Sequence, residues 1–279
     1  MIAKTFAYYL PSTEIEAAEV FLRSKAQGKQ VLYYGGGSEI ITMATAGTIA
    51  PDVVIDIKAL PAMNALEIHG CQLILGGAVS LERIRVSNLF PLLGVVVGRI
   101  ADHTNQCRIT LGGNLCGTII YREAVLPLLL SDAMVALWGP EGPRQAPIQD
   151  VFQGRMRLRE GEFVHQILVN TAYTQAPFFH IKQTLGEKIG YPAVTIAMLW
   201  DGEQRRMAFS GICEKPFRST AMENAMNNPA KPLADRVAQA MDCLPMGTLE
   251  NQEGSGTYRR QILHKLLTQF GEKSGYENL

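Results

Sequence analysis

Residues 31–40, VLYYGGGSEI, place three consecutive glycines and a serine directly behind a β-branched and aromatic run. The run is typical of a strand, and EIITMATAG at residues 39–47 indicates a short helix that begins just behind the glycines. Glycine loses more conformational freedom on folding than any other residue, so three in a row indicate that something approaches the chain too closely for side chains. A strand, a glycine loop and a helix N-terminus together can bind phosphate through backbone N–H groups.

The loop does not match the two commonest phosphate-binding motifs. A Walker A loop ends in Gly-Lys-Ser/Thr, which is missing here, and a G-x-G-x-x-G fingerprint would place its last glycine where Ile40 stands. Asp56 follows the next predicted strand, about where a ribose ligand would lie in a dinucleotide fold. A cap or turn residue is the alternative interpretation of Asp56.

A second glycine loop, TLGGN at residues 110–114, repeats the pattern of the first. An apolar residue precedes two glycines, and Asn114 adds a side-chain donor and acceptor. Two loops that offer backbone donors suit a ligand with two adjacent phosphates. The pair therefore predicts a dinucleotide such as FAD.

The order of predicted elements indicates an α+β fold. TEIE at residues 13–16 is a capping box, with Thr13 at the cap and Glu16 three positions on, and it begins a helix. Strands are predicted within residues 51–60 and 71–80, and beyond Thr171 three strands precede two or three helices. We expect an FAD-binding domain at residues 1–174, in two lobes of about 1–57 and 58–174, and a C-terminal domain at 175–279 with a three-stranded antiparallel sheet.

Composition excludes several classes of protein. The 279 residues include 26 basic and 26 acidic ones and no basic run, so no attraction to nucleic acid or to an anionic membrane is expected. The first 20 residues lack the apolar core of a signal peptide, and no apolar stretch is long and continuous enough to cross a bilayer. We expect a cytoplasmic protein.

The five cysteines give no sign of a metal site, because no two of them have C-x-x-C spacing. Cys107 and Cys116 are expected to be buried free thiols, and the five histidines have no spacing typical of metal ligands. Any redox chemistry would therefore depend on a bound cofactor.

Nearly the whole chain resembles the FAD-binding medium subunit of molybdenum hydroxylases, the group of xanthine dehydrogenase and carbon monoxide dehydrogenase. The resemblance is carried by YYGGGSEIITM, PDVVIDIKAL, LILGGAVSLERI, CRITLGGNLCGTIIYREAVLPLLLSDAMVAL and FHIKQTLGEKIGYPAVTIAM, in that order. The late helix GTYRRQILHKLLTQ also resembles the closing helix of the family. The fold implied is a two-lobed FAD-binding domain followed by a small C-terminal domain.

The resemblance also implies where FAD would bind. Its diphosphate would lie between the two glycine loops, and its ring would lie against HIKQTLGEKIGY, which offers Lys182, Lys188 and Tyr191. A lysine near the ring would stabilise negative charge on the reduced flavin, and a tyrosine would cover one ring face. The cofactor-binding residues expected from the loops and the resemblance together are Tyr34, Gly35, Gly36, Gly37, Ser38, Glu39, Ile40, His103, Thr110, Leu111, Gly112, Gly113, Asn114, Tyr121, Glu123, Lys182 and Tyr191.

The sequence departs from the family pattern just behind the second loop. Residues 117–126 carry Ile119, Ile120 and Tyr121 where the family has small polar residues, and Glu123 is the only acidic residue there. Either Tyr121 and Glu123 replace the usual contacts to the flavin, or the ring-side pocket has been rebuilt.

The resemblance implies an electron-transfer subunit without catalytic acid, base or nucleophile of its own. In the family, one partner subunit carries two [2Fe–2S] clusters and a large subunit carries the molybdenum cofactor. Electrons would reach FAD from a cluster and leave to NAD⁺ or another acceptor.

Two other functions are compatible with parts of the sequence. A free-standing flavin or nicotinamide oxidoreductase of the Rossmann type would need a parallel sheet throughout, against which the strand-rich segment beyond Thr171 argues. A non-catalytic scaffold that has lost its flavin is favoured only by the irregular stretch GTIIYREAV.

Overall fold

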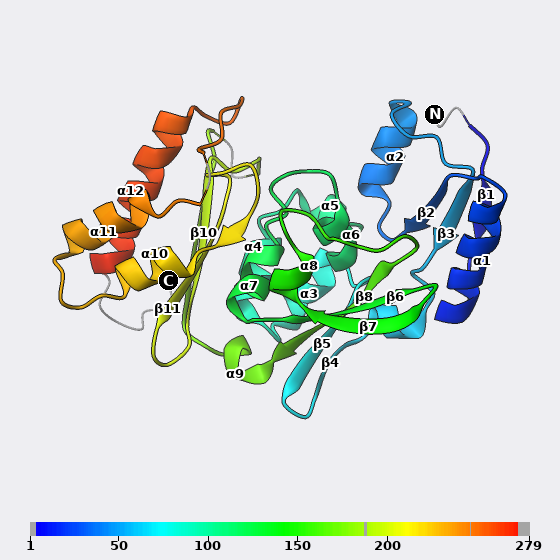
Figure 1. The fold of residues 1–279 in the computed structure, drawn as a ribbon, viewed down its shortest axis with the longest axis horizontal. Helices are drawn as coiled ribbons and strands as arrows, with labels where there is room; N and C mark the ends of the chain where they lie inside the picture. The colour runs from blue at the N-terminus through cyan, green and yellow to red at the C-terminus, as the bar shows by residue number, and fades with distance from the viewer. Residues whose placement is uncertain (1–3, 187–188, 246, 273–279) are drawn as a thin grey trace.

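Three sheets follow one another along the longest axis of the computed structural model, which describes residues 4–186, 189–245 and 247–272 (Figure 1). Lys188 of the predicted ring-side segment lies outside these residues. Helices and strands alternate irregularly, and most strand pairs are antiparallel. The predicted α+β class is confirmed, and the antiparallel sheets contradict a Rossmann-type oxidoreductase.

The N-terminal sheet is the parallel one, with the strand order β1-β3-β2. Its strands are β1 (Ala7–Tyr9), β2 (Val31–Tyr34) and β3 (Val53–Asp56). Helix α1 (Glu14–Ala26) packs its apolar side on this sheet, and α2 (Ser38–Thr45) follows the first glycine loop. The predicted capping box is confirmed, because the Glu16 amide donates to Thr13 Oγ1 at 3.1 Å and the Glu16 carboxylate accepts from the Ser12 amide at 2.7 Å.

The central sheet has five antiparallel strands in the order β4-β5-β8-β6-β7. They are β4 (Leu66–His69), β5 (Gln72–Gly76), β6 (Met134–Gly139), β7 (Gly142–Pro147) and β8 (Phe163–Asn170). The segments between them form α3 (Leu81–Ser87), α4 (Pro91–Val97), α5 (His103–Gln106), α6 (Leu111–Cys116), α7 (Val125–Leu130) and α8 (Ile148–Val151), while η1 (Pro61–Asn64) precedes β4 and α9 (Thr171–Thr174) follows β8. Their leucines and valines build the largest hydrophobic core.

The C-terminal sheet has the order β12-β11-β10-β9 and is antiparallel. Strands β9 (Phe178–Gln183), β10 (Val194–Trp200) and β11 (Arg205–Ser210) are the three predicted ones. A fourth, β12 (Phe217–Arg218), was missed because two residues are too short for a strand pattern to appear. The next helix, α10 (Thr220–Met226), begins behind the cap Ser219, and α11 (Leu233–Asp242) and α12 (Gly256–Glu272) follow as predicted.

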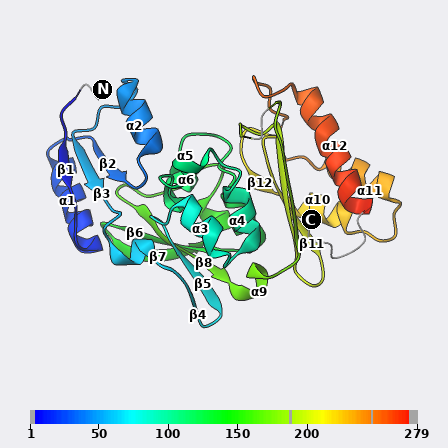
Figure 2. The same cartoon turned by 180° about the vertical axis from the view of Figure 1, so that it is seen from behind.

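Strand β10 is apolar except for Thr195, because both of its faces are buried. Ile196 and Met198 face the core beneath α10, α11 and α12, whereas Ala197 and Leu199 belong to the core of the central sheet. Helix α7 contacts β10, β11 and β12, so it lies against the C-terminal sheet on the face opposite α12 (Figures 1 and 2). The two sheets are thus joined through α7.

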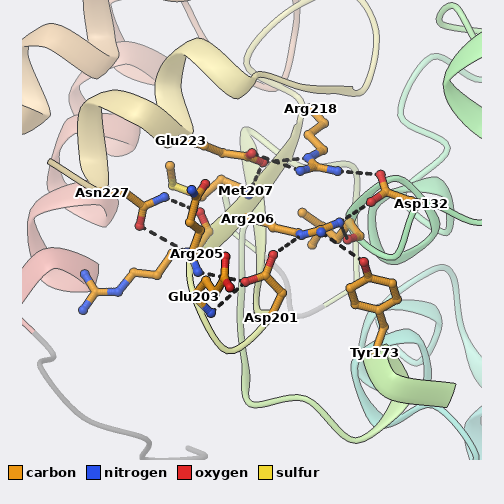
Figure 3. Close-up of polar contacts among 12 residues, drawn as sticks. Asp132, Tyr173, Asp201, Glu203, Arg205, Arg206, Met207, Arg218, Glu223 and Asn227 are labelled. Atoms are coloured by element: carbon orange, nitrogen blue, oxygen red, sulfur yellow. Dashed lines mark hydrogen bonds and ion pairs between the residues drawn. The ribbon is translucent and has the colours of Figure 1, made fainter. Parts of the chain in front are cut away.

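Polar contacts fix the C-terminal end of α7 to the same sheet (Figure 3). Asp132 accepts hydrogen bonds from Arg206 and from Arg218, the latter at 2.8 Å, and both guanidinium groups also donate to the last carbonyls of α7. Arg206 donates further to Asp201 at 2.7 Å and to the Tyr173 hydroxyl at 3.0 Å. The bonds from Arg206 and Arg218 to Asp132 join residues that are 74 and 86 positions apart in the chain.

Replacement of Asp132 by alanine is expected to lower the free energy of unfolding by about 2 kcal/mol, since two largely buried guanidinium groups lose a charged acceptor. Asp132→Asn should cost about half as much, because an amide oxygen remains and asparagine tolerates the φ of 49° found here. Urea unfolding measures both, with the exposed Asp150→Asn as the control. Equal midpoints for Asp132→Ala and the wild type would contradict the assignment.

Candidate functional site

The two glycine loops lie directly against each other. A Cβ atom added to Gly35 would lie 2.9 Å from Thr110 Oγ1, and one added to Gly36 would overlap the carbonyl oxygen of Arg108. Gly37 has a φ of 75°, and a side chain there would also overlap the Tyr34 hydroxyl. The three glycines are therefore required by the second loop and by the turn itself.

The first loop leaves a helix N-terminus open. Gly37 occupies the cap position of α2 and provides no side-chain hydrogen bond to the first turn, where Ser38, Glu39 and Ile40 lie. Amides of a first turn have no partner within their own helix, so those of α2 are free to bind an anion. The Ser38 Oγ atom is buried and has no hydrogen-bond partner in the described part of the chain.

The second loop differs from the prediction, because most of its amides are already used. Leu111 donates to the Val79 carbonyl and Gly112 to the Gly77 carbonyl, both at 2.9 Å, while Gly113 donates to Thr110 Oγ1 at 3.1 Å. These amides in the first turn of α6 are therefore not available to bind an anion. What the loop still offers is Asn114, whose Oδ1 is buried and unpartnered among the described residues.

Glu39, in α2, is hydrogen-bonded to Thr118, which lies a few residues behind the second loop. Its carboxylate accepts from the Thr118 amide at 2.8 and 3.0 Å and also from the Thr118 hydroxyl. Tyr34, on the other side of the first loop, has its ring 4.1 Å from the Lys58 ammonium nitrogen. Glu39 and Tyr34, which were both predicted from the first loop, thus contact residues around that loop.

The divergent stretch behind the second loop contacts α2 at one end and the C-terminal sheet further on. Tyr121 is buried, its ring stacks on Tyr191 with centroids 4.9 Å apart, and its carbonyl accepts from Ser210 at 2.7 Å. Its hydroxyl donates to Glu253 at 3.1 Å and accepts from Asn251 at 2.9 Å. Burial raises the pKa of the Tyr121 phenol. The structure therefore brings the two tyrosines predicted from distant segments together.

Glu123 and Lys182 form a buried ion pair with 2.6 Å between Oε2 and Nζ. Thr195 donates to the other Glu123 oxygen at 2.6 Å, and Lys182 donates also to the Arg99 carbonyl at 2.8 Å. Since each charge has its opposite within contact distance, the pair contributes no net charge. Its place between α7 and β9 makes it a joint between the central and C-terminal sheets.

Some sequence-based predictions fall outside this cluster. The contacts of His103 are with Glu82, 3.6 Å away on α3, and with the Cys107 thiol, 3.8 Å away, and its side chain is 69% exposed. Cys107 and Cys116 are free, as predicted, but exposed; burial was wrongly expected because α5 and α6 are short and end at the surface. No cluster of three potential metal ligands occurs among residues 4–186, 189–245 and 247–272.

Asp56 takes the alternative role of a turn residue. Its carboxylate accepts from the Lys58 amide at 2.9 Å, from the Lys58 ammonium at 2.5 Å and from the Tyr8 hydroxyl at 2.5 Å. The bond to Asp56 raises the pKa of Tyr8 to about 12.

Sequence reasoning missed several residues that shape the site. A side chain at Gly77 would overlap the Val164 carbonyl oxygen, which explains the glycine pair of LILGGAVS, a signal visible in the sequence. Arg122 is buried and donates to the carbonyls of Gly117 and Gly154 at 2.7 and 2.5 Å. Nothing in the sequence around Arg122 distinguishes it from an exposed arginine.

A cavity of about 390 Å³ lies elsewhere, between α4, β9 and the end of α12. Val95, Phe178 and His180 line it, and none of its lining residues belongs to a glycine loop. Burial lowers the pKa of His180 to about 4, so the imidazole is neutral near pH 7.

Two glycine loops in contact, one of them between a strand and an open helix N-terminus, are typical of a protein that binds a phosphate-bearing cofactor. Residues 4–170 match the family described as the FAD binding domain in molybdopterin dehydrogenase, and the chain belongs to that family. It is accordingly an FAD-dependent oxidoreductase subunit of the molybdenum hydroxylase type.

Curated relatives match most of the chain. The medium chain of glyceraldehyde dehydrogenase from Sulfolobus acidocaldarius is 24% identical over 93% of this chain and 95% of its own length. The FAD-subunit of nicotinate dehydrogenase from Eubacterium barkeri is 21% identical over 75% of this chain and 72% of its own.

Solved structures share the fold throughout. A chain of quinoline 2-oxidoreductase from Pseudomonas putida 86 has a TM-score of 0.85 at 16% identity and covers 98% of both chains. A chain of carbon monoxide dehydrogenase from Hydrogenophaga pseudoflava has a TM-score of 0.82 at 20% identity, with 96% of both covered.

The residues present fit FAD. A diphosphate needs hydrogen-bond donors on a surface that side chains do not obstruct, and the glycine loop with the open N-terminus of α2 offers both. The unpartnered Ser38 Oγ and Asn114 Oδ1 are polar atoms that a bound dinucleotide would satisfy, and leaving such atoms buried without a partner costs free energy. In the part of the chain that the structure describes, no helix is both long and apolar enough to cross a membrane.

Proposed function

We propose that FAD binds where the two glycine loops meet, with the diphosphate against the open first turn of α2. The observation that carries the proposal is the pair of buried, unpartnered polar atoms, Ser38 Oγ and Asn114 Oδ1, on loops that touch. The first loop would supply the backbone donors, and the second would supply the Asn114 side chain and the wall behind the glycines. The predicted set from Tyr34 to Ile40 and from Thr110 to Asn114 keeps this role in the proposal.

We further propose that the ring end of FAD lies toward Tyr121 and Tyr191, which stack on each other. Glu123 and Lys182 would then lie beside the ring as a neutral ion pair that joins the central and C-terminal sheets. Lys182 would not present an uncompensated charge to the ring. His103 is left without a part in this site, because its contacts are on the exposed side of α5. The division into domains 1–174 and 175–279 stays a prediction, in which the joint would lie at their boundary.

The chain would act as the electron-outlet subunit of a larger enzyme. Electrons would come from a subunit with [2Fe–2S] clusters, which itself receives them from a subunit with the molybdenum cofactor, and would leave to NAD⁺ or another acceptor. Relatives described as a medium chain and an FAD-subunit support the heteromeric arrangement. FAD supplies the conversion between one-electron and two-electron transfer when bound, while this chain binds and orients it. A cytoplasmic location stays a prediction from the sequence.

The test of the site is the Ser38→Ala variant. Loss of an unpartnered hydroxyl should leave the free energy of unfolding of the FAD-free protein unchanged or slightly raised, since no bond is broken. The dissociation constant for FAD should rise about tenfold, as expected for loss of one hydrogen bond to a charged group. Fluorescence titration with FAD and urea unfolding measure the two quantities. Asn114→Ala should also weaken FAD binding, but by less, because Asn114 Oδ1 can only accept, and its partner would be a neutral hydroxyl of the dinucleotide and not the diphosphate.

Ser219→Ala is the matched control, because Ser219 caps α10 and accepts from the Met222 amide at 3.3 Å. It should lower the free energy of unfolding by about 1 kcal/mol and leave FAD affinity unchanged. Identical FAD titrations for wild type, Ser38→Ala and Asn114→Ala would contradict the proposed site. A purified protein that is colourless and takes up no FAD would support the scaffold alternative.

A further inference from the structure

Arg259, in the first turns of α12, is a fully buried arginine. Its guanidinium group donates to the Ala193 and Gly211 carbonyls at 2.5 and 2.6 Å and also to the side-chain oxygen of Asn251. Longer bonds run to the carbonyls of Gly254 and Pro192, at 3.1 and 3.2 Å. Both terminal nitrogens and Nε are therefore used, and one side chain holds three separate loop segments together.

All of these acceptors are neutral. Across residues 4–186, 189–245 and 247–272, no carboxylate lies within ion-pair distance of Arg259. The buried charge of Lys182, by contrast, has Glu123 beside it, and that of Arg218 has both Asp132 and Glu223. A buried cation without a counterion is costly, and such groups are enriched where a function uses their charge.

The position of Arg259 connects this charge to the proposed ring end of the site. Asn251 accepts from Arg259 through Oδ1 and donates through Nδ2 to the Tyr121 hydroxyl at 2.9 Å. The carbonyl of Pro192, another acceptor, belongs to the residue next to Tyr191, which stacks on Tyr121. Two carboxylates of this neighbourhood bond to other groups: Glu253 accepts from the Tyr121 hydroxyl at 3.1 Å, and Glu250 accepts from the Gly256 amide at 3.3 Å. Arg259 therefore lies directly behind the stacked tyrosines.

We propose that Arg259 is a positioning residue that fixes the wall behind Tyr121 and Tyr191 and supplies uncompensated positive charge to the ring end of the flavin site. The inference rests on the proposed function, because it places the ring beside these tyrosines. A positive charge in a poorly solvated region stabilises the negative charge that the flavin gains on reduction. Arg259, and not the neutralised Lys182, would thus raise the reduction potential of the bound flavin.

The test uses two substitutions that remove the net charge in different ways. Asn251→Asp places a carboxylate against the guanidinium at nearly constant shape. It keeps the oxygen that Arg259 and the Glu253 amide bond to and loses the bond from Nδ2 to the Tyr121 hydroxyl. Arg259→Met removes the charge and the bonds together. Spectroscopic redox titration of the FAD-loaded chain should show the reduced flavin destabilised about tenfold relative to the oxidised form in both variants. For a two-electron couple this equals a potential lower by about 30 mV.

Glu253→Gln is the matched control, since it removes a negative charge at the same place and should leave the potential unchanged or raise it. A purely structural role for Arg259 would change stability and FAD affinity in Arg259→Met but would leave the potential of Asn251→Asp at the wild-type value, and this result would overturn the inference. If Arg259→Met does not fold, Asn251→Asp decides alone. If the wild-type chain takes up no FAD, the proposed function fails first.

Discussion

Replacement of Gly36 by alanine is expected to abolish FAD uptake by the chain. The added Cβ would overlap the Arg108 carbonyl oxygen and would lie 2.9 Å from its carbonyl carbon and 3.2 Å from the Cα of Ile109. All three atoms belong to the backbone of the two residues that lead into the second loop, so no side-chain rotation relieves the contact. The two loops must therefore move apart, and the proposed diphosphate site at their junction is lost. We expect the dissociation constant for FAD to rise by more than a hundredfold, which corresponds to more than about 2.7 kcal/mol.

Two other glycines provide controls for the Gly36→Ala variant. A Cβ at Gly94, within α4, would meet its nearest neighbour at an ordinary 3.5 Å, so Gly94→Ala should leave FAD binding unchanged and add a little stability. Gly113→Ala would meet only Thr110 Oγ1, at 2.9 Å, and should weaken FAD binding by less than Gly36→Ala does. Equilibrium dialysis with FAD measures all three. Wild-type affinity in Gly36→Ala would show that contact between the loops is not needed for the site.

The glycine loops were the most predictable part of the site, although their physical reason was not. The sequence shows that something must approach residues 35–37, and a ligand was the natural interpretation. The structure shows instead that the second loop makes the closest approach to Gly35 and Gly36. A sequence cannot distinguish these cases, because a glycine indicates that a side chain has no room at that position and does not indicate which atoms occupy the space.

The amides of the second loop illustrate the same limit. TLGGN resembles a set of free donors in the sequence, yet Leu111 and Gly112 donate to carbonyls more than 30 positions earlier in the chain, at Val79 and Gly77. Such pairing depends on how the sheets assemble, which local patterns do not contain. The same holds for the three loop segments gathered around Arg259.

Strand and helix patterns, in contrast, predicted most elements of the fold. The capping box at Thr13 and the three long C-terminal strands follow from local chemistry, and the structure has them. Strand β12 was missed because two residues are too short for a period to appear. Exposure of Cys107 and Cys116 was missed because it depends on where two short helices end.

Replacement of Lys182 by methionine is expected to lower the free energy of unfolding by about 3 to 5 kcal/mol, the usual effect of leaving one charge of a buried ion pair alone. The Lys182 and Glu123 side chains are only 2% and 5% exposed, so water cannot replace the lost ammonium. The carboxylate would keep Thr195 as a partner but would have no cation. Urea unfolding of the variant and the wild type measures this difference.

The double variant Glu123→Gln with Lys182→Met decides what the pair does. If the pair is a neutral joint between α7 and β9, removal of both charges should recover most of the stability that Lys182→Met loses, and the flavin potential should stay at its wild-type value. The exposed pair of Lys25 and Glu160 is the control, since Lys25→Met should cost less than about 1 kcal/mol. A lower flavin potential in the double variant would instead mean that the ammonium of Lys182 acts on the ring despite its carboxylate partner, as the resemblance to the family first implied.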